Sequence, residues 1–501
     1  MEYILVDGSF WEEEARKIMA NKDIRLTALF ANDERPVYHG MAVYAIFSDR
    51  QNHCHRGLKT LLFDEPWELP SLVPVTPAAA WYEREMHDLF GIIPTGHPDL
   101  RPLVLHENWS EGFFPLCKDF SPPGGVPFEN REFPMPAVEG NGVFEVPVGP
   151  IHAGIIEPGH FRFSQAGEHI INLEAKLFFT HRGIEKAVEG LDVKKALLQA
   201  ERICGACTVS HAFSYSEALE SIAGVKVPRE AQLGRVVIAE LERLYNHIGD
   251  IGNLCAGLGL AIGTSHGGRL KEKMMRLNES IAGNRFLRGM IIPGGLQVPI
   301  TPLMAEDILA VIREVEPDFK QLIAMLQDHE AFLDRVNTTG VVPYEAAVDL
   351  ALVGVGARAS GVSTDVRRDF PYAAYDKLDF IVPVYSQGDV ASRLWVRADE
   401  TIQSFDLIRQ ALDHMDGSSD WLCTLPSLPP LATGFGCTES PRGSNFHWIM
   451  TGKNNTLYRL FVRSASYPNW PALAVAAPGN IIPDFPLINK SFELCYACID
   501  R

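Results

Sequence analysis

The chain lacks any run of apolar residues long enough to cross a bilayer. One long uncharged stretch, 251–268, contains six glycines and a histidine, which is typical of a closely packed helix end and not of a membrane span. The first residues, MEYILVDGSFWEEEARK, place acidic side chains where a signal peptide needs a basic region followed by an apolar one. We therefore expect a cytoplasmic chain that contacts a membrane only through partner subunits.

Positive charge is also scarce. The sequence has 45 Lys and Arg residues against 63 Asp and Glu residues, and its formal net charge is -18. A phosphate backbone attracts basic surfaces, so this balance argues against nucleic acid as a partner. Internal repeats and low-complexity tracts are absent, and a hydrophobic share of 46% is ordinary for a globular protein.

The 501 residues exceed what one hydrophobic core usually supports. Hydrophobic periodicity and the content of Pro and Gly divide the chain into three parts. Residues 1–120 alternate short apolar runs with helical patches, which predicts a small α/β domain. Residues 121–143 are rich in Pro and Gly and lack a period, as a surface linker does. Residues 144–501 are mainly helical with minor β structure. The prediction is an α+β fold with a small N-terminal domain joined to a large helical one.

Two helical segments stand out in the large domain. Apolar residues recur at steps of three and four, which predicts one long buried helix face, at Leu233, Val237, Leu241, Leu244, Ile248, Ile251 and Cys255. The segment 304–336 also has a helical pattern, and Pro317 should end or kink it, because proline lacks the backbone N–H that a helix uses.

Nine cysteines are an odd number, and cytosolic thiols stay reduced, so clustered cysteines here indicate metal or redox chemistry. Two C-x-x-C pairs occur, in ERICGACTVSH (Cys204, Cys207) and in SFELCYACIDR (Cys495, Cys498). Each pair can present two thiolates to one centre, and both together complete a four-sulfur site. Spacing alone leaves open a zinc or iron-sulfur site, a thioredoxin-like redox pair, chance buried cysteines, or a soft metal such as nickel or iron, with Arg202 helping to keep the sulfurs ionised.

Four further segments narrow these alternatives. RICGAC followed by a C-terminal C-x-x-C resembles the two nickel-binding signatures of nickel-iron hydrogenase large subunits. HRGIEK at 181–186 and ESPRGSNFHW at 439–448 resemble motifs of the same family, with Ser440 where the family has alanine. WYEREMHDLFGIIPTGHPDLRPLVL followed by CKDF resembles the 30 kDa subunit of respiratory complex I. This fusion is the layout of formate hydrogenlyase large subunits and their energy-converting, complex I-related relatives.

The resemblance implies a catalytic subunit that interconverts dihydrogen with protons and electrons, evolving hydrogen in a formate hydrogenlyase-like complex. Cys204 and Cys495 would bind nickel terminally, and Cys207 and Cys498 would bridge nickel to an iron that carries carbon monoxide and cyanide. The first proton acceptor would be the thiolate of Cys495 or the guanidinium of Arg442, the thiolate being the easier chemical choice since arginine stays protonated. An ordinary buried ion pair is the alternative for Arg442.

Two glutamates have roles by the same resemblance. Glu157, in EPGHFRF, would relay protons with a pKa raised by burial, although Pro158 intervenes where group-one hydrogenases have glutamate directly before Gly-His, and a structural acid is the alternative. Glu185 would bind a secondary metal, Mg, or pair with Arg182. Asp365, Arg367 and Asp369, with His152, fall on segments that resemble the quinone-facing loops of complex I, and solvated surface charges are their alternative. The lone cysteines are expected to be small buried residues, at positions Cys54, Cys117, Cys255, Cys423 and Cys437.

The lack of a further cysteine cluster in this chain predicts which partner subunits it needs. No further cysteine cluster is available for an iron-sulfur wire, so no iron-sulfur cluster is expected in this chain and a small iron-sulfur hydrogenase subunit is implied. The resemblance adds a ferredoxin-like iron-sulfur subunit, antiporter-like membrane subunits, a maturation protease and nickel-insertion proteins. The chain would then lie peripherally on the inner face of the cell membrane.

The match departs from the family at the end of the chain. Glu493 and Leu494 stand where the family usually has Asp-Pro before its last cysteine pair. The sequence stops at Arg501, as a processed large subunit does, and a trimmed chain or a gene without the extension would end in the same way. A metal-free complex I-type subunit with a quinone site, a non-catalytic coupling subunit, and a structural four-cysteine zinc protein are the alternative functions.

Overall fold

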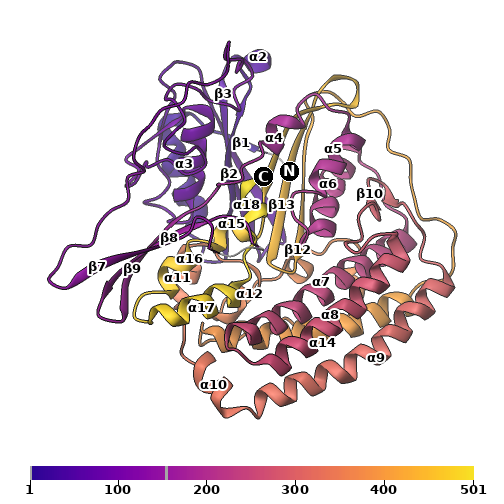
Figure 1. Ribbon diagram of the computed structural model, residues 1–501. Helices are drawn as coiled ribbons and strands as arrows, with labels where there is room; N and C mark the ends of the chain where they lie inside the picture. The colour runs from indigo at the N-terminus through magenta and orange to yellow at the C-terminus, as the bar shows by residue number, and fades with distance from the viewer. Residues whose placement is uncertain (1–2, 153–155) are drawn as a thin grey trace.

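The computed structural model describes residues 3–152 and 156–501, and it confirms the predicted α+β fold (Figure 1). The N-terminal unit is built on a four-stranded sheet of order β1-β4-β3-β2, in which only the β1–β4 pair is parallel. Its strands and helices are β1 (Tyr3–Leu5), α1 (Trp11–Met19), β2 (Ile24–Asp33), α2 (Arg35–Tyr38), β3 (Met41–Asp49), β4 (Cys54–Leu62), β5 (Glu68–Pro70), α3 (Ala79–Phe90) and β6 (Ile93–Thr95).

Strands β2 and β3 are buried along almost their whole length. A strand covered on both faces reads as a continuous apolar run, which explains LTALFA and YAIFS. Helix α3 packs on one side, and on the other Phe30 stacks on Phe461 of the large unit with ring centroids 4.2 Å apart. The two units therefore share one hydrophobic core.

Residues 96–142, all of them described, form neither helix nor strand. This irregular stretch begins well before the Pro- and Gly-rich segment expected at 121–143, whose last residue, Val143, begins β7. An antiparallel three-stranded sheet follows and projects from the body of the molecule (Figure 1). It consists of β7 (Val143–Val148), β8 (His160–Ala166) and β9 (His169–Lys176).

Long helices form most of the large unit and lie side by side in Figure 1. The predicted stripe on 233–255 is buried throughout, along α7. Helices α7 and α8 approach so closely that a Cβ on Gly267 would lie 2.6 Å from the Cα of Gly252, which explains the glycines between them. The helices are α4 (Ile184–Ala187), α5 (Val193–Ala200), α6 (Thr208–Ala223), α7 (Arg229–Gly257), α8 (Ala261–Ala282), α9 (Pro302–Gln327), α10 (Glu330–Val336), α11 (Tyr344–Asp349), α12 (Gly354–Ala359), α13 (Val366–Asp369) and α14 (Val390–Asp413).

The sequence predicted that Pro317 would end or kink its helix, and the first of these was wrong, because the helix does not end there. Helix α9 runs through the proline and ends at Gln327. Residues on either side of it, such as Val315 and Phe319, are fully buried. Packing of this face outweighs the loss of one backbone hydrogen bond.

The last part of the chain returns to the N-terminal sheet. Strands β12 (Thr433–Ser440), β13 (Gly443–Thr451) and β14 (Leu457–Arg463) form an antiparallel sheet, and the Trp448 indole donates to the Tyr3 hydroxyl at 2.7 Å. The remaining elements are β10 (Ile291–Ile292), β11 (Gly295–Leu296), α15 (Ser466–Asn469), α16 (Ala472–Ala476), α17 (Phe485–Phe492) and α18 (Tyr496–Asp500). Across the described helices, the structure contains none with both the length and the apolar character of a membrane span.

Candidate metal centre

The fold brings the two cysteine pairs together. The Sγ atoms of Cys204, Cys207, Cys495 and Cys498 all lie within 4.8 Å of one another. The first pair lies on the turn between α5 and α6, and the second pair begins α18. Cys495 is half-buried and the other three are buried, so one corner of the cluster is more open than the rest.

Side chains of helix α7 bind the backbone of the turn that carries Cys204 and Cys207. Its Tyr245 hydroxyl donates to the carbonyl of Gly205 at 3.0 Å, and the Asn246 amide donates to that of Ala206 at 2.8 Å. The Glu242 carboxylate accepts the Val209 backbone N–H at 2.6 Å. These α7 residues are at most four positions apart, so one face of the helix fixes the turn that carries two of the four cysteines.

A pair of histidines lies behind the last cysteine. The Nε2 atom of His211 is 3.6 Å from the Sγ of Cys498, and its Nδ1 is 2.9 Å from the Nε2 of His447. Burial lowers the pKa of His211 to about 3 and the pKa of His447 also falls. Both imidazoles are therefore neutral at ordinary pH, and a neutral His211 with its proton on Nε2 donates to the sulfur.

The donor set fits a soft metal. Four thiol sulfurs converge, and no carboxylate lies in the same described cluster. Hydrogen bonds from the other three cysteines, together with the charge of Arg442, hold the pKa of Cys495 well below its ordinary value. Thiolates at this spacing suit nickel, iron or zinc, so geometry alone does not choose among these metals.

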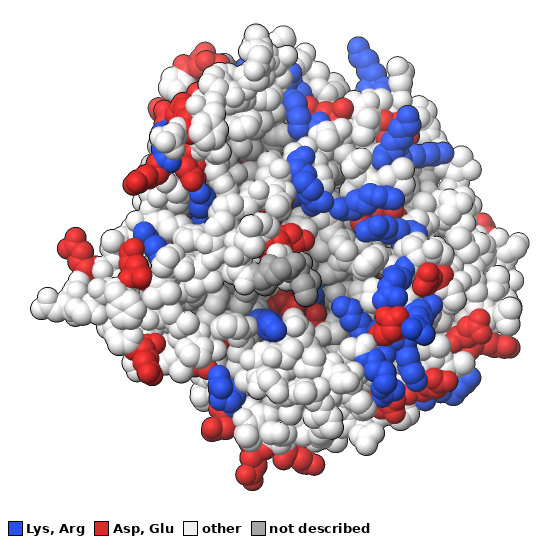
Figure 2. Space-filling model, in the orientation of Figure 1, with Lys and Arg blue, Asp and Glu red and all other residues white. Residues whose placement is uncertain are grey.

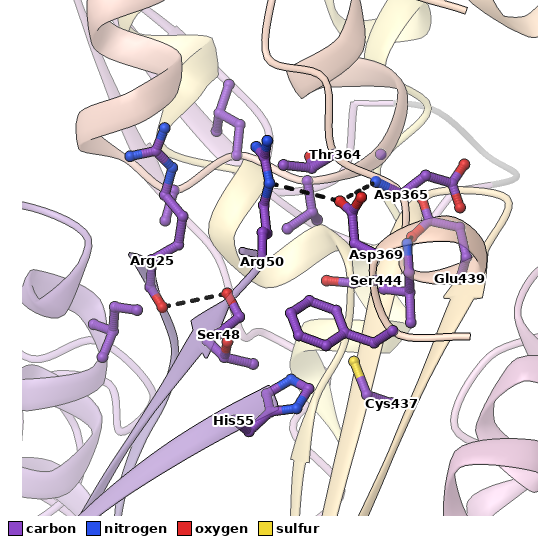
Figure 3. Close-up of a pocket in the computed structure, with 18 of the residues that line it drawn as sticks. Arg25, Ser48, Arg50, His55, Thr364, Asp365, Asp369, Cys437, Glu439 and Ser444 are labelled. Carbon is purple, nitrogen blue, oxygen red and sulfur yellow. Dashed lines mark hydrogen bonds and ion pairs between the residues drawn. The ribbon is translucent and has the colours of Figure 1, made fainter. Parts of the chain in front are cut away.

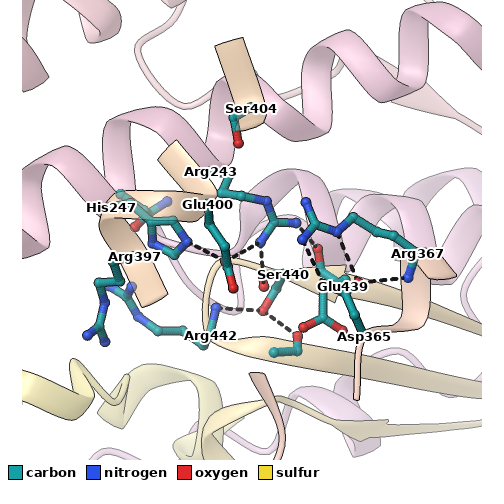
Figure 4. Close-up of polar contacts among 12 residues, drawn as sticks. Arg243, His247, Asp365, Arg367, Arg397, Glu400, Ser404, Glu439, Ser440 and Arg442 are labelled. Atoms are coloured by element: carbon teal, nitrogen blue, oxygen red, sulfur yellow. Dashed lines mark hydrogen bonds and ion pairs between the residues drawn. The ribbon is translucent and has the colours of Figure 1, made fainter. Parts of the chain in front are cut away.

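Arg442 connects this site to a buried charge network, shown in Figure 4. It lies in the turn between β12 and β13, and its Nη2 donates to Asp250 Oδ1 at 3.0 Å. Asp250 also pairs with Arg397 at 3.3 Å. Arg442 is thus a buried ion pair, and it also lies close enough to raise the charged fraction of Cys495. The structure therefore shows the ion pair that was the alternative for Arg442, and a role as proton acceptor stays a prediction.

The network continues away from the cysteines. His247 Nε2 lies 2.8 Å from Glu400 Oε2, and Arg358 Nη2 lies 2.7 Å from Glu400 Oε1. Arg358 also donates to Glu439 at 2.8 Å. Glu439 belongs to the motif ESPRGSNFHW, whereas His247, Arg358 and Glu400 carried no recognisable motif, and the available signal for them was a charged or polar residue inside a helix.

Comparison with known proteins decides the chemistry of the cluster. Models of the respiratory-chain NADH dehydrogenase 30 kDa and 49 kDa subunits match residues 4–126 and residues 259–427 and 426–501. A model of the nickel-dependent hydrogenases matches residues 182–256, which include the first cysteine pair. Hydrogenase-4 component G of Escherichia coli is 35% identical over 95% of this chain and 84% of that protein.

Two further relatives agree. Formate hydrogenlyase subunit 5 of Escherichia coli is 34% identical over 95% of this chain and 84% of its own length. The carbon monoxide-induced hydrogenase of Rhodospirillum rubrum is 33% identical over 72% of this chain and 99% of its own. The chain belongs to the energy-converting, complex I-related nickel-iron hydrogenase large subunits. It is a hydrogenase, and nickel is the metal that its family requires.

The two predicted glutamates of this hydrogenase large subunit lie in different surroundings. Glu157 is exposed, so the burial expected for it was wrong, because its segment 156–158 lies on the surface before β8. Glu185 is buried, and it pairs with Arg459 at 2.8 Å and Arg501 at 3.0 Å. It does not pair with Arg182, whose guanidinium donates instead to backbone carbonyls.

Arg202 and the lone cysteines also differ from expectation in part. The Arg202 side chain is half-exposed and pairs loosely with Glu201 at 3.7 Å, directed away from the sulfurs and toward the end of α5. Cys117, Cys255 and Cys437 are buried as expected. Cys54 is exposed and Cys423 is half-buried, since both lie near surface turns.

The quinone-loop segment of this hydrogenase is not solvated. Asp365, Arg367 and Asp369 are all buried, so solvated surface charge was the wrong interpretation. Asp365 and Asp369 line a cavity of about 60 Å³ between the two units, together with His55 and Arg50 (Figure 3). His152 lies elsewhere, with its Nε2 3.4 Å from the Tyr496 hydroxyl.

Proposed function

We propose that Cys204, Cys207, Cys495 and Cys498 bind nickel together with an iron that carries carbon monoxide and cyanide. The observation that carries the proposal is the convergence of the four sulfurs within 4.8 Å. By the family resemblance, Cys207 and Cys498 would contact both metals, and Cys204 and Cys495 would hold nickel alone. The exposed fractions support this division, since Cys207 (2%) and Cys498 (1%) are more deeply buried than Cys204 (7%) and half-buried Cys495.

The reaction is the interconversion of dihydrogen with protons and electrons, in the hydrogen-evolving direction. A soft nickel with an open coordination position supplies the polarisation that makes dihydrogen acidic. Cys495, the more open sulfur, would hold the proton on its way between solvent and the metals. Arg442 stays charged and, held by Asp250, keeps positive potential beside that sulfur. Exposed Glu157 would exchange protons with solvent, and it would take them up when hydrogen is evolved.

We propose two domains, 1–120 and 144–501, joined by the segment 121–143. The family models support this division, because the 30 kDa-type match ends at residue 126 and the hydrogenase-type match begins at residue 182. The Rhodospirillum rubrum relative, matched over 72% of this chain and 99% of itself, is consistent with a large unit that occurs without the small one.

The chain works within a formate hydrogenlyase-like complex on the inner face of the cell membrane. Its partners are a small iron-sulfur hydrogenase subunit, a ferredoxin-like iron-sulfur subunit and antiporter-like membrane subunits. A maturation protease and nickel-insertion proteins act before assembly. Although the chain is acidic overall, Figure 2 shows Lys and Arg side chains gathered over α5–α8, which gives a partner of opposite charge a place to bind.

The experiment is an infrared spectrum of the anaerobically purified complex, where metal-bound carbon monoxide and cyanide absorb. We expect these bands in the native complex, their loss in Cys498→Ala, and their retention in Cys437→Ala, which removes a buried thiol outside the cluster. Absence of the bands from a fully matured native complex would contradict the proposal. A metal-free complex I-type subunit would then become the better interpretation.

A further inference from the structure

The guanidinium of Arg501 lies between two buried carboxylates from different domains. Its Nη1 is 3.0 Å from Glu185 Oε1 on α4, and its Nη2 is 2.5 Å from Glu85 Oε2 on α3. Arg459 on β14 pairs with the other oxygen of Glu185 at 2.8 Å. All four side chains are at most 6% exposed, so water contributes little to solvating these charges.

This cluster does not fit the secondary magnesium ion expected at Glu185. Mg²⁺ needs six oxygen ligands in an octahedron, whereas the oxygens of Glu185 already accept Arg459, Arg501 and the backbone N–H of Val462 at 3.0 Å. Two carboxylates face two guanidinium groups, so the formal charge of the cluster is zero. A divalent cation placed there would leave two buried positive charges uncompensated.

Aromatic rings complete the surroundings of the two arginines. The Arg501 Cζ lies 5.3 Å from the ring centroid of Tyr467 and 5.9 Å from that of Phe461, and the Arg459 Cζ lies 5.5 Å from that of Phe90. Ring faces at these distances attract a guanidinium, whereas they offer no lone pair to a metal ion. The pocket is therefore built for cationic side chains.

We infer that Arg501 takes the place of a second metal ion, and that Glu85 thereby makes the N-terminal domain part of what positions the last cysteine pair. Arg501 follows the five-residue helix α18, which carries Cys498. The Arg182 backbone N–H also binds the Arg501 carbonyl at 3.0 Å. Arg501 and Glu85 are positioning residues, since neither contacts the sulfurs. The inference rests on the proposed function, because it assumes that Cys498 binds metal.

The first test measures magnesium and nickel in the purified complex after dialysis against a chelator. We expect nickel to remain, the magnesium content to be the same in the native complex and in Glu185→Gln, and the melting temperature to be unchanged by added magnesium. Magnesium bound at one ion per nickel in the native complex and lost in Glu185→Gln would overturn the inference.

The second test compares Glu85→Gln with Glu83→Gln. Both residues are buried carboxylates on α3, but Glu83 binds Ser71 and the Leu72 backbone and does not contact Arg501. Removing one partner of a buried pair is costly, so we expect Glu85→Gln to lose nickel to a chelator about tenfold faster and to shift the carbon monoxide band. Glu83→Gln should do neither, and Glu85→Asp should restore part of the native behaviour.

The outcomes separate the two ideas. A native complex without nickel contradicts the proposed function. The ion pairs of Arg501 with Glu85 and Glu185 are then tested by stability alone, with Glu85→Gln expected to melt lower than Glu83→Gln at every magnesium concentration. A native complex with nickel, but with equal nickel loss and an identical infrared spectrum in Glu85→Gln and Glu83→Gln, overturns the positioning role of Arg501.

Discussion

Arg442 and Asp250 form a two-fold hydrogen-bonded ion pair beside the cysteine cluster, with both residues less than 10% exposed. Burial alone would raise the pKa of Asp250, but Arg442, with His247 and Arg397, holds it well below the ordinary value. The carboxylate is therefore ionised throughout the ordinary pH range. Its two oxygens accept two hydrogen bonds from the Arg442 guanidinium and so fix the orientation of that side chain.

The first prediction concerns the ion pair between Arg442 and Asp250. Arg442→Lys keeps the charge but cannot donate two parallel hydrogen bonds to Asp250, so we expect hydrogen oxidation with an artificial acceptor to fall about tenfold or more, with nickel content unchanged. The matched control is Arg229→Lys, which alters an exposed pair with Asp416 and should leave both quantities unchanged. Native activity in Arg442→Lys would show that the two parallel hydrogen bonds to Asp250 are not needed for catalysis.

The second prediction concerns the departure from Asp-Pro. Glu493 adopts a left-handed conformation, with φ 51° and ψ 43°, at the end of α17. A residue before proline is forced toward extended conformations, so Leu494→Pro should not restore a family feature here. We expect it to lower the free energy of unfolding by about 1–3 kcal/mol, and with it the melting temperature. We also expect it to reduce the nickel content. Leu494→Met should change neither quantity by much, and a Leu494→Pro protein with native nickel content would contradict this account.

The third prediction concerns proton transfer to solvent. Glu157→Gln keeps the size of an exposed side chain and removes its ability to carry a proton. If Glu157 is the outer relay, hydrogen evolution should slow by about tenfold or more, while nickel content and the infrared bands stay native. Exposed Glu145→Gln, on β7, is the control. Equal rates in the two variants would leave Glu157 as a surface acid without a catalytic role.

The fourth prediction follows from a buried acid in the N-terminal domain. Burial raises the pKa of Glu83 to about 7, whereas glutamate in an unfolded chain titrates near ~4.3. The native state thus holds a proton that the unfolded state releases between these values, so this group lowers stability as pH rises from about 4.3 to about 7. Glu83→Gln should therefore gain stability relative to the native chain over that window, by about 1–3 kcal/mol.

Thermal melts at pH 5 and pH 8 check this prediction. The difference in melting temperature between Glu83→Gln and the native chain should become more positive at the higher pH. Exposed Glu111→Gln should show no such trend. A difference that is the same at both pH values would mean that Glu83 is ionised in the folded protein throughout.

The amino-acid sequence by itself determined the two cysteine pairs that converge, the family, the buried face of α7 and the irregular segment before β7. These features depend on residues close together in the chain, since the spacing in C-x-x-C fixes two thiolates and steps of three and four fix one helix face. Pro317 marks the limit of such local rules, because packing around Phe319 carried the helix past it.

Only the tertiary structure decided which charges meet. Glu185 lies three residues from Arg182 in the chain, yet its partners are Arg459 and Arg501, and Glu85 reaches the last residue from the other domain. The exposure of Glu157 and the burial of Asp365 were set in the same way. Ion pairs in a protein interior depend on distance and desolvation, and both are fixed by segments far apart in sequence once they pack together.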